Sequence, residues 1–328
     1  MRAATYSGKG GVEVIALRDD VPDPEVGTDD ALVEVAFAGL NRADILERQG
    51  LYPMPKRGIE IPGMEFSGVV RATGSGVTNV FAGDRVCGLV QSGAQAELLA
   101  TNALTLSKVP EGVSLRDAAA IPEAFITAHD ALFARGRFAL GETAIVHAVG
   151  SSVGLAALAL VKRAGGIAIG TSRTAEKLER AKEHGLDFGF LLDDGWRGRV
   201  HAATNGRGAD VILDFVGAGM LDGNLGVLAT RGRIVQIGTM GGANVSVHLG
   251  LLMSKRGELH GTVLRTRPVE QKIAIAKDFE RTQLPLFARG ELRAEVDRVF
   301  PLAELAAAHE YMESNKNFGK IVLEVRPG

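Results

Sequence analysis

The segment from Thr143 to Gly165 constrains the fold of this chain more than any other. It reads TAIVHAVGSSVGLAALALVKRAG: an apolar run of strand length, a turn rich in glycine and serine, and a helix of small residues. Small residues let the backbone approach a pyrophosphate, whose charge then meets N–H groups at the helix N-terminus. The segment therefore predicts the phosphate-binding half of a βαβ unit. Its turn residues, our first cofactor-binding candidates, are Gly150, Ser151, Ser152, Val153 and Gly154.

The turn alone is a weak signal, because it lacks a strict GxGxxG and an ordinary tight strand–helix connection would look the same. The sequence around the turn is a more specific signal for the fold, because strands and helices are expected to alternate from Glu142 to Leu264. We expect strands at Thr143–His147, Ile167–Thr171, Phe188–Leu192, Val211–Phe215, Arg233–Gly238 and Glu258–Leu264, and helices at Leu155–Arg163, Ala175–His184, Trp196–Ala203 and Leu221–Ala229. This alternation predicts a doubly wound parallel sheet.

The first 120 or so residues have a different pattern, in which short alternating strands are separated by proline and glycine. The strands expected here are Val12–Ala16, Ala31–Ala38, Gly68–Ala72, Arg85–Leu89 and Ala96–Ala100. They predict a β-barrel or sandwich that is interrupted by one polar excursion, residues 41–62. Ser114 followed by Asp117 predicts the N-cap of a helix. Further elements are expected at Ala124–Ala134, near Val269–Arg289 and at Lys320–Val325.

Composition limits the classes of function. The 37 lysine and arginine residues nearly balance the 39 acidic ones, which argues against the basic footprint of a nucleic-acid-binding protein. The single cysteine, Cys87, excludes an internal disulfide and a multi-cysteine zinc site, and its apolar strand places it in the core. We find no apolar stretch typical of a secretory signal and no window apolar enough to span a bilayer. We therefore expect a cytoplasmic protein with no membrane or nucleic-acid partner.

Five stretches of the sequence carry a family resemblance. They are GLNRADILERQGLYP at 39–53, IPGMEFSGVV at 61–70, AAAIPEAFITAHDAL at 118–132, HAVGSSVG at 147–154 and NKNFGKIVLEV at 315–325. Together they resemble the medium-chain dehydrogenase/reductase superfamily, and within it the zinc-free quinone oxidoreductase branch of zeta-crystallin-like NADPH:quinone reductases. The phosphate turn departs from the usual H-A-x-x-G-G-V-G of that branch, because Ser151 and Ser152 replace the paired glycines. Serine is small and can donate to a phosphate, so cofactor binding is expected to survive.

The resemblance implies an α/β protein of two domains. A GroES-like β-barrel catalytic domain would comprise residues 1–121 and 265–328, and a Rossmann domain with a doubly wound parallel six-stranded sheet would comprise 122–264. The activity implied is metal-free hydride transfer from NADPH to a small-molecule acceptor, a quinone or similar conjugated carbonyl. The resemblance also implies a homodimer or homotetramer, in which the expected edge strand Glu258–Leu264 pairs with its symmetry mate.

The positions that bind zinc in metal-dependent relatives are changed in this chain. Asn41 stands where those relatives have the Cys of G-x-C-x-x-D, Met64 replaces the His of G-H-E, and Glu123 corresponds approximately to a further Cys position. Tetrahedral zinc needs thiolate, imidazole or carboxylate ligands, and the residues that remain do not supply three of them. We therefore expect no metal.

Asn41 and Tyr52 are the catalytic candidates. By resemblance Asn41 faces the nicotinamide, and its amide can both donate and accept hydrogen bonds. The alternative is a residue that caps the local turn, a role equally open to Asp44. The Tyr52 phenol could donate to an acceptor oxygen, and the alternative is a ring packed on Pro53 or Pro55.

The remaining cofactor-binding candidates follow family positions. Thr127 resembles the threonine beneath the nicotinamide, with local helix packing as the alternative. Lys320 resembles a residue that reaches the cofactor, with a solvated surface charge as the alternative. Leu264 and Arg265 begin a run that resembles an L-R-S-R motif, and the alternative there is a basic surface turn. His147 is expected to be a structural residue. Four residues near the ends of two expected strands complete the set: Val216, Gly217, Ile237 and Gly238.

The chain that follows the second expected Rossmann strand predicts NADPH in preference to NADH. At this point of a Rossmann unit an acidic residue binds the ribose 2′-hydroxyl of NADH and repels a 2′-phosphate. Ser172 stands in that place, Arg173 follows it, and Lys177 lies one turn into the next helix. A hydroxyl and two cations form a phosphate site. The alternative is that both cations pair with Glu176 and Glu179 on a solvated helix face.

Two other functions stay open. An enal, enone or enoyl-thioester reductase could use the same scaffold, because a fold does not fix a substrate. A non-catalytic NADPH-binding protein, structural or RNA-associating, is the third possibility. The near-neutral charge and the lack of a basic stripe interleaved with aromatic residues argue against RNA binding.

Overall fold

The computed structural model describes residues 1–52 and 58–326. The chain forms two compact units, which we call unit 1 (Met1–Ile126 and Leu264–Gly328) and unit 2 (Thr127–Val263). The division therefore lies after residues 126 and 263, whereas the domain boundaries expected from the sequence lay after 121 and 264. The first boundary falls inside a helix, α3 (Pro122–His129), so one element belongs to both units.

Unit 2 contains a fully parallel six-stranded sheet in the order β10–β9–β8–β11–β12–β13. The strands are β8 (Thr143–Val146), β9 (Ile167–Ser172), β10 (Phe188–Leu191), β11 (Ala209–Asp214), β12 (Leu228–Gln236) and β13 (Glu258–Gly261). The order reverses between β8 and β11, which is the switch point at which doubly wound sheets bind ligands. The predicted doubly wound parallel sheet is thus confirmed.

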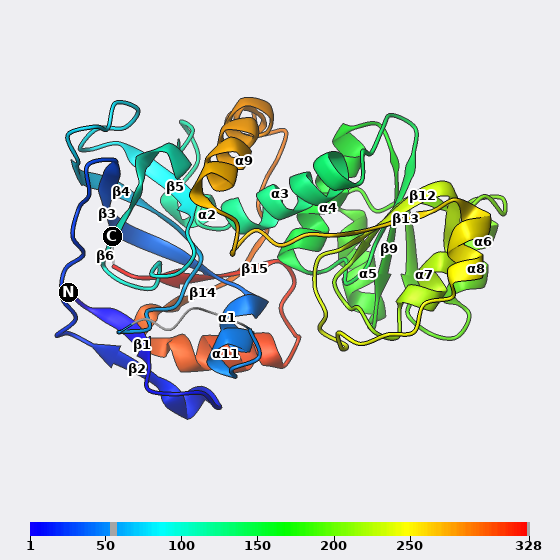
Figure 1. The fold of residues 1–328 in the computed structure, drawn as a ribbon, viewed down its shortest axis with the longest axis horizontal. Coiled ribbons are helices and arrows are strands. Elements are labelled where there is room, and N and C mark those ends of the chain that lie inside the picture. The colour runs from blue at the N-terminus through cyan, green and yellow to red at the C-terminus, as the bar shows by residue number, and fades with distance from the viewer. Residues whose placement is uncertain (53–57, 327–328) are drawn as a thin grey trace. The chain divides into compact units, whose positions relative to one another are not determined.

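Helices cover both faces of this sheet. Figure 1 shows α4 (Ser152–Arg163) and α5 (Ala175–Lys182) on one face, and α6 (Trp196–Ala203) and α7 (Leu221–Val227) on the other. A short α8 (Leu249–Lys255) packs on β12. β8 and β11 are buried along their whole length, since both of their faces are covered.

Several expected boundaries in unit 2 are wrong by a few residues. The helix expected to reach Ala229 ends at Val227, because β12 already begins at Leu228. The strand expected over Glu258–Leu264 ends at Gly261, where its pairing with β12 stops. α3 continues into a π-helical segment, Asp130–Arg135. Element ends are set by tertiary pairing, which a local pattern does not record.

Unit 1 is built around a seven-stranded sheet in the order β14–β15–β3–β4–β5–β7, with β6 also paired to β3. Its strands are β3 (Asp30–Leu40), β4 (Glu65–Thr73), β5 (Arg85–Leu89), β6 (Leu98–Asn102), β7 (Leu106–Lys108), β14 (Val296–Pro301) and β15 (Lys320–Glu324). A separate hairpin joins β1 (Ala3–Tyr6) to β2 (Ile15–Arg18). β15, from the end of the sequence, lies antiparallel to β3 and so completes a sheet that the first 110 residues begin.

The expectations for unit 1 hold for its strands better than for its helices. The N-cap at Ser114 is confirmed, because its hydroxyl accepts from the Asp117 amide at the start of α2 (Leu115–Ala118). The strand expected from Val12 is wrong there, since residues 12–14 form a 3₁₀ turn. The helix expected near Val269–Arg289 is two helices, α9 (Val269–Thr282) and α10 (Leu284–Ala288).

Two helices of unit 1 were not expected. α1 (Arg42–Arg48) lies within the polar excursion, and α11 (Leu305–Glu313) precedes β15. A signal for α1 was present, because Asn41 and Asp44 have the spacing of an N-cap and its third helical residue. The Asp44 carboxylate accepts a hydrogen bond from the backbone N–H of Asn41 at 2.8 Å.

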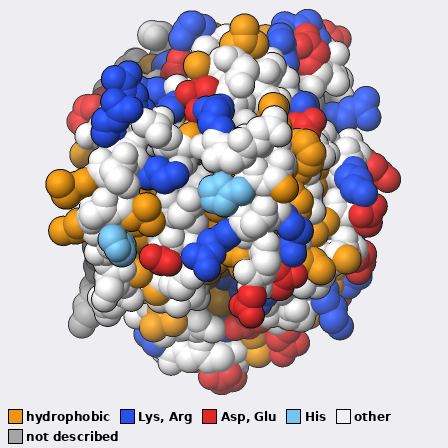
Figure 2. Space-filling model, turned by 90° about the vertical axis from the view of Figure 1, so that its right-hand side faces the viewer, with side chains coloured by type: hydrophobic (Ala, Val, Ile, Leu, Met, Phe, Trp, Pro, Cys, Tyr) orange, Lys and Arg blue, Asp and Glu red, His pale blue; other side chains and the backbone are white. Residues whose placement is uncertain are grey.

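One face of the molecule carries a mixture of positive and negative side chains (Figure 2). On the face in Figure 2 basic, acidic and hydrophobic side chains are interspersed, and no single sign of charge dominates. Within residues 1–52 and 58–326 there is no helix with the length and apolar character to cross a bilayer.

Candidate functional site

Asn41 and Glu123, two of the positions compared above with zinc ligands, contact the Glu65 carboxylate in the interior of unit 1. Asn41 Nδ2 donates to Glu65 Oε1 at 2.8 Å, and the backbone amide of Glu123 donates to Glu65 Oε2, also at 2.8 Å. Lys320 Nζ forms an ion pair with Glu65 Oε1 and donates to Asn41 Oδ1 at 2.8 Å. Lys320 is 1% exposed and Glu65 is fully buried. We call Asn41, Glu65 and Lys320 the lysine cluster.

The sheet of unit 1 brings these residues together. Asn41 directly follows β3, Glu65 begins β4, and Lys320 begins β15, and both β4 and β15 pair with β3. Gly39 lies opposite Glu65 in this register. A Cβ atom on Gly39 would overlap the Glu65 carboxylate, so glycine is required here by close approach.

Asn41, one of the positions compared above with zinc ligands, contacts an ammonium ion in the lysine cluster. No group of three or more His, Cys, Asp or Glu side chains suited to a metal occurs in the described parts of the chain. The alternative that Lys320 is a solvated surface charge is wrong, because a buried ammonium needs the carboxylate it contacts here. A role of Lys320 toward the cofactor stays a prediction.

The Asn41 amide is oriented by its neighbours. Its oxygen accepts from Lys320, one of its N–H groups donates to Glu65, and the other faces the Gly39 carbonyl at 3.5 Å. A contact of 3.5 Å is at the outer limit of a hydrogen bond. One N–H group of the Asn41 side chain is therefore only weakly hydrogen-bonded. The residue is 7% exposed.

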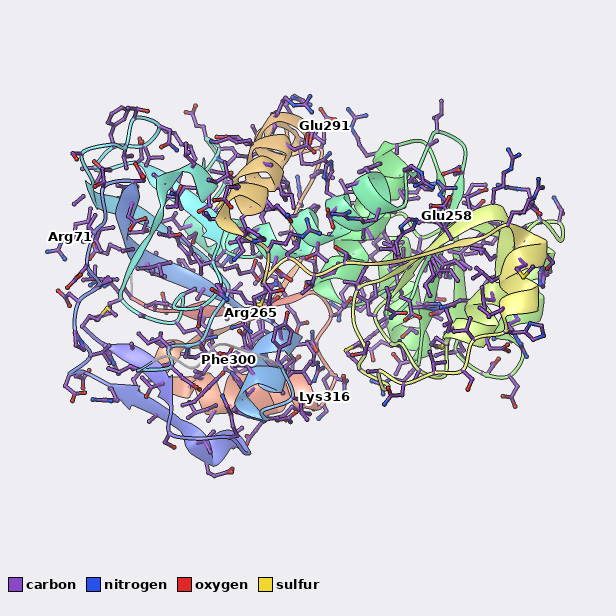
Figure 3. All side chains as sticks on the ribbon, viewed as in Figure 1. Arg71, Glu258, Arg265, Glu291, Phe300 and Lys316 are labelled. Carbon is purple, nitrogen blue, oxygen red and sulfur yellow. The ribbon has the colours of Figure 1, made fainter. Side chains whose placement is uncertain are left out.

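A second group of buried ions is formed by three residues of α1 and by Arg265. Asp44, Glu47, Arg48 and Arg265 are each at most 4% exposed. Arg265 forms an ion pair with Glu47 through Nη2 and donates to the Gln91 carbonyl at 2.7 Å through Nε. The alternative of a basic surface turn is therefore wrong for Arg265, which Figure 3 labels. Burial raises the pKa of Asp44 to about 7, although the positive charge of Arg265 opposes this rise.

Tyr52 stands over Arg265. The guanidinium carbon lies 5.2 Å from the centre of the Tyr52 ring, within the range of a cation–π contact. Burial raises the pKa of the Tyr52 hydroxyl, with the charge of Arg265 acting in the opposite direction, so the group stays protonated at neutral pH and can donate. Pro53 and Pro55, named above as possible packing partners of this ring, lie outside the described residues.

An apolar pocket lies beside these residues, and all of its lining belongs to unit 1. Met64 and Glu123, two of the former metal-ligand positions, line it together with Leu264 and Arg265. The cavity itself is small, about 20 Å³. Its far wall is formed by one face of α9, which contributes Lys272, Ile275 and Ala276.

Unit 2 contributes the phosphate turn, which connects β8 to α4. Ala148 adopts a left-handed conformation with φ of 47°, which turns the chain sharply after β8. Ser151 is the N-cap of α4, and its hydroxyl accepts from the Gly154 amide at 3.1 Å. A Cβ on Gly154 would lie 2.6 Å from the Val149 carbonyl oxygen, so only glycine allows this close packing. Ser151, Ser152 and Val153 are half-buried, and Gly150 and Gly154 are buried.

The candidates at the ends of the central strands are held by one buried carboxylate. Asp214 Oδ1 accepts from the amides of Val216 at 2.6 Å and Gly217 at 3.0 Å, and the Asp214 carbonyl accepts from the Ile237 amide at 2.8 Å. Gly217 has a φ of 84°, which favours glycine. Gly238 is half-buried beside them. Thr127 is buried on α3. It is the first residue of unit 2, whereas Ile126 before it belongs to unit 1.

His147 is structural, as expected. Its Nδ1 lies 2.7 Å from Thr171 Oγ1 and its Nε2 lies 2.7 Å from Asn224 Oδ1, so both ring nitrogens have partners. Asn224 in turn donates to Asp214 Oδ2 at 2.9 Å. Burial lowers the pKa of His147, which keeps the ring neutral. Cys87 is also in the core, as expected, and burial raises the pKa of its thiol to about 12.

The three residues expected to bind a 2′-phosphate lie at the end of β9 and the start of α5. Ser172 is buried and its hydroxyl accepts from the Thr174 amide at 3.1 Å. Arg173 is exposed and Lys177 is half-buried. Glu179, one expected partner of these cations, is paired with Lys182 at 2.7 Å. With a tight turn, a helix N-terminus and no acid at Ser172, unit 2 fits a dinucleotide phosphate.

Two residues that organise the site, Glu65 and Glu47, were not predicted from the sequence. Glu65 appeared in the G-M-E motif but received no role, and Glu47 was not singled out. Glu65 could have been found from its motif, because a glutamate that begins a buried strand needs a cation. Glu47 gives no such signal, since it is one polar residue in a polar segment.

Two protein-family models match this chain. The alcohol dehydrogenase GroES-like domain matches residues 27–125, and a zinc-binding dehydrogenase family matches residues 187–323. The second family is named for zinc, but residues 41, 64 and 123 lie outside the region it matches.

Individual relatives are similar over nearly the whole chain. The quinone oxidoreductase-like protein 2 of Mus musculus is 34% identical, across 95% of this chain and 89% of that protein. The quinone oxidoreductase of Pseudomonas aeruginosa is 32% identical, across 97% and 98% respectively. Among solved structures, the Escherichia coli quinone oxidoreductase complexed with NADPH is similar with a TM-score of 0.87 and 29% identity, covering 99% of this chain and 100% of that one.

Proposed function

The chain belongs to the medium-chain dehydrogenase/reductase superfamily of oxidoreductases, with quinone oxidoreductases among its relatives, and we propose that it transfers hydride from NADPH to a quinone or similarly conjugated carbonyl without a metal. The observation that carries this proposal is the lysine cluster. Lys320 supplies a positive charge next to Asn41, yet Glu65 and Asn41 enclose it. An acceptor that needs no Lewis acid, such as a quinone, suits this arrangement.

The donors beside the pocket support reduction of a carbonyl. When bound, NADPH supplies the hydride, and negative charge then develops on the acceptor oxygen. The Tyr52 hydroxyl and the weakly bound N–H of Asn41 are the groups that we assign to this oxygen. Neither has to be a strong acid, because a quinone is already electrophilic and water can deliver the proton. The lining of the pocket is mostly apolar, which is the character that sites for conjugated rings have.

The choice of NADPH rests on unit 2. Ser172 replaces the acid that NADH-binding units use, and Arg173 is exposed and adjacent to it. The Escherichia coli structure in complex with NADPH supports the same choice.

The test is an NADPH-oxidation panel of quinones, enals, enones and saturated ketones, repeated with NADH. We expect the highest kcat/KM with NADPH and a quinone, and little turnover of ketones. Faster turnover of enones or enoyl thioesters would favour the second function named above. Tight NADPH binding with no oxidation by any acceptor would favour a non-catalytic protein.

Metal independence has its own test. Exhaustive dialysis against a strong chelator is expected to leave the rate unchanged, with no stoichiometric zinc in elemental analysis. A tightly held equivalent of zinc that is lost together with activity would refute this part of the proposal.

We further propose that two copies pair through β13. This strand is an edge of the sheet in unit 2, and Figure 3 labels Glu258 at its start. Leu259 on β13 and Met253 on α8 are 44% and 75% exposed, so apolar side chains lie at the surface near this edge, together with the ion pair of Glu258 and Arg137. Natural proteins cover or pair such edges. A strictly monomeric mass in light scattering at micromolar concentration would contradict this proposal.

A further inference from the structure

A continuous series of hydrogen bonds crosses the sheet of unit 2 where its central strands end. The hydroxyl of Thr171, on β9, lies 2.7 Å from His147 Nδ1, and His147, which follows β8, places Nε2 2.7 Å from Asn224 Oδ1. Asn224 Nδ2 then donates to Asp214 Oδ2, at the end of β11, at 2.9 Å. All four residues are at most 1% exposed. We call Thr171, His147, Asn224 and Asp214 the histidine network.

The direction of each hydrogen bond in this network follows from its last member. A carboxylate only accepts hydrogen bonds, so the Asn224 amide donates to Asp214 and turns its oxygen toward His147. His147 must therefore carry its proton on Nε2, which leaves Nδ1 to accept from the Thr171 hydroxyl. Because every donor points the same way, each bond polarises the next one and strengthens it. Only one tautomer of His147 satisfies this arrangement.

The histidine network ends at the backbone of two cofactor-binding candidates. Asp214 Oδ1 accepts from the amides of Val216 at 2.6 Å and Gly217 at 3.0 Å. Both N–H groups follow the orientation of this carboxylate, because they share one of its oxygens. Among the described residues, the Asn224 side chain is the only donor to the other oxygen, Oδ2. The position of the segment 215–218 therefore depends on the Asn224 amide and, one bond further back, on the histidine.

Packing alone does not account for a histidine at position 147. The ring is held by Trp196 on α6, edge to face, with the ring centres 5.6 Å apart. An apolar side chain of similar size would fill the same space without the free-energy cost of burying a polar ring. An apolar side chain would not, however, donate to Asn224 or accept from Thr171. The hydrogen bonds that the ring orients therefore explain why a histidine stands here.

We propose that His147 is a positioning residue for the dinucleotide cofactor, and that it acts through Asn224 to hold the segment 215–218 in its binding conformation. This inference rests on the proposed function for the cofactor-binding residues and does not depend on the acceptor. Because the network acts on binding, its loss should raise the Kd of NADP+ and the KM of NADPH. The KM of the acceptor and kcat at saturating NADPH should stay nearly unchanged.

Two substitutions of His147 separate the roles of its two nitrogens. Glutamine places its amide nitrogen near the position of Nε2 and can still donate to Asn224, whereas asparagine reaches only as far as Nδ1 and so only to Thr171. In calorimetric titrations of the full-length protein, His147→Asn is expected to raise the Kd of NADP+ about tenfold, the equivalent of one hydrogen bond. His147→Gln is expected to restore most of this affinity.

The matched control lies on the same strand, β11. Asp210 is near the start of β11, and its Oδ2 accepts from the Thr143 amide at the start of β8, at 2.8 Å. Asp210→Ala therefore loosens the same two strands at their opposite end. It is expected to reduce the free energy of unfolding, as His147→Asn does, but to leave the Kd of NADP+ unchanged. An equal rise of this Kd in Asp210→Ala would overturn the inference, because general loosening of the sheet would then explain the effect.

Amide hydrogen exchange locates the effect within unit 2. In His147→Asn the amides of Val216 and Gly217 are expected to exchange faster than in the wild type, because their acceptor is no longer oriented. The Gly154 amide, which is bound to the Ser151 hydroxyl in the phosphate turn, is expected to keep its rate. Unchanged exchange of the first two amides would contradict the proposed role.

The outcomes also separate this inference from the proposed function. Equal Kd values for NADP+ in the wild type and His147→Asn, or equal losses in the two His147 variants, would overturn the inference even if quinones are reduced rapidly. Failure to oxidise NADPH with any acceptor would overturn the proposed function, and the titration with NADP+ would still decide the role of His147. If His147→Asn does not fold, Asn224→Leu, which interrupts the network one bond later, replaces it with the same expected result.

Discussion

The buried carboxylate at the centre of unit 2, Asp214, and the buried glutamates of unit 1 are stabilised in different ways. In unit 2, Asp214 is bound by the amides of Val216 and Gly217 and by the side chain of Asn224, all within ten residues of it in the sequence. In unit 1, Glu65 and Glu47 are neutralised by Lys320 and Arg265, which are 255 and 218 residues away. Asp214 of unit 2 is thus stabilised by local dipoles, and Glu65 and Glu47 of unit 1 by full charges from distant segments.

The difference fits the chemistry proposed for each unit. A phosphate is bound by N–H groups at a helix N-terminus, and its binding involves no proton transfer. A carbonyl that gains negative charge is stabilised by donors whose positions are fixed before the reaction. Pairs of buried ions provide such fixed positions, but each ion is costly to bury without its partner.

The largest expected effect comes from separating the charges of the lysine cluster. Lys320→Met is expected to reduce the free energy of unfolding by about 3–5 kcal/mol, because Glu65 is left buried and unpaired. Asp214→Asn in unit 2 is expected to cost only about 1–2 kcal/mol, since an amide oxygen can still accept from the same N–H groups. Chemical denaturation measures both. We expect the double variant Glu65→Gln, Lys320→Met to regain most of the lost stability, which would show that the unpaired charge causes the loss. Equal losses for the two single variants would contradict the difference between the units.

The next effect is a pH dependence that belongs to unit 1. The pKa of Asp44 is about 7 in the folded protein, above its ordinary value of 3.8. Between these values the folded state holds a proton that the unfolded state has released. The free energy of unfolding therefore decreases as the pH rises from about 4 through 7, by at most about 4 kcal/mol. Asp44→Asn is expected to remove this decrease in denaturation curves recorded from pH 4 to 8, and an unchanged pH profile would contradict it.

A smaller effect is expected in unit 2, on cofactor choice. Arg173→Ala should weaken NADPH binding by about 1–3 kcal/mol, the range for hydrogen bonds to charged groups, and leave NADH binding nearly unchanged. Lys182→Ala on the same helix is the control, because Lys182 is already paired with Glu179. Fluorescence titration with both cofactors measures the two constants. Equal losses for NADPH and NADH, or a wild-type preference for NADH, would show that Arg173 does not read a 2′-phosphate.

The smallest effect concerns the proposed donor of unit 1. Tyr52→Phe should lower kcat about tenfold and leave the Kd of NADPH unchanged, because the hydroxyl meets charge only as it develops. A quinone needs little help, so we expect the low end of the range for losing one such donor. Tyr311→Phe is the control, since the Tyr311 hydroxyl is bound to Asp297 at 2.9 Å and its ring packs on Arg298, whereas the Tyr52 ring packs on Arg265. An unchanged kcat in the Tyr52 variant would return this ring to a packing role.

The same difference between local and distant contacts decides what the sequence could predict. The strand Arg85–Leu89, the N-cap at Ser114 and the helix Trp196–Ala203 follow from patterns within a few residues, and all three occur as expected. The phosphate turn was also recognised from one short segment. Lys320 and Arg265 looked like surface charges or cofactor ligands, because their partners Glu65 and Glu47 are more than 200 residues away.

The distribution of charge along the chain also has a consequence for biosynthesis. The carboxylates of Asp44, Glu47 and Glu65 leave the ribosome long before the cations Arg265 and Lys320. Unit 2 is one continuous segment and can fold as soon as it emerges. The buried carboxylates of unit 1 lack their cations until β15 has been synthesised. We therefore expect the first part of unit 1 to stay unfolded, with its carboxylates in water, while unit 2 folds. A ribosome stalled before Lys320 would therefore hold a protease-sensitive first part next to a protease-resistant, folded unit 2.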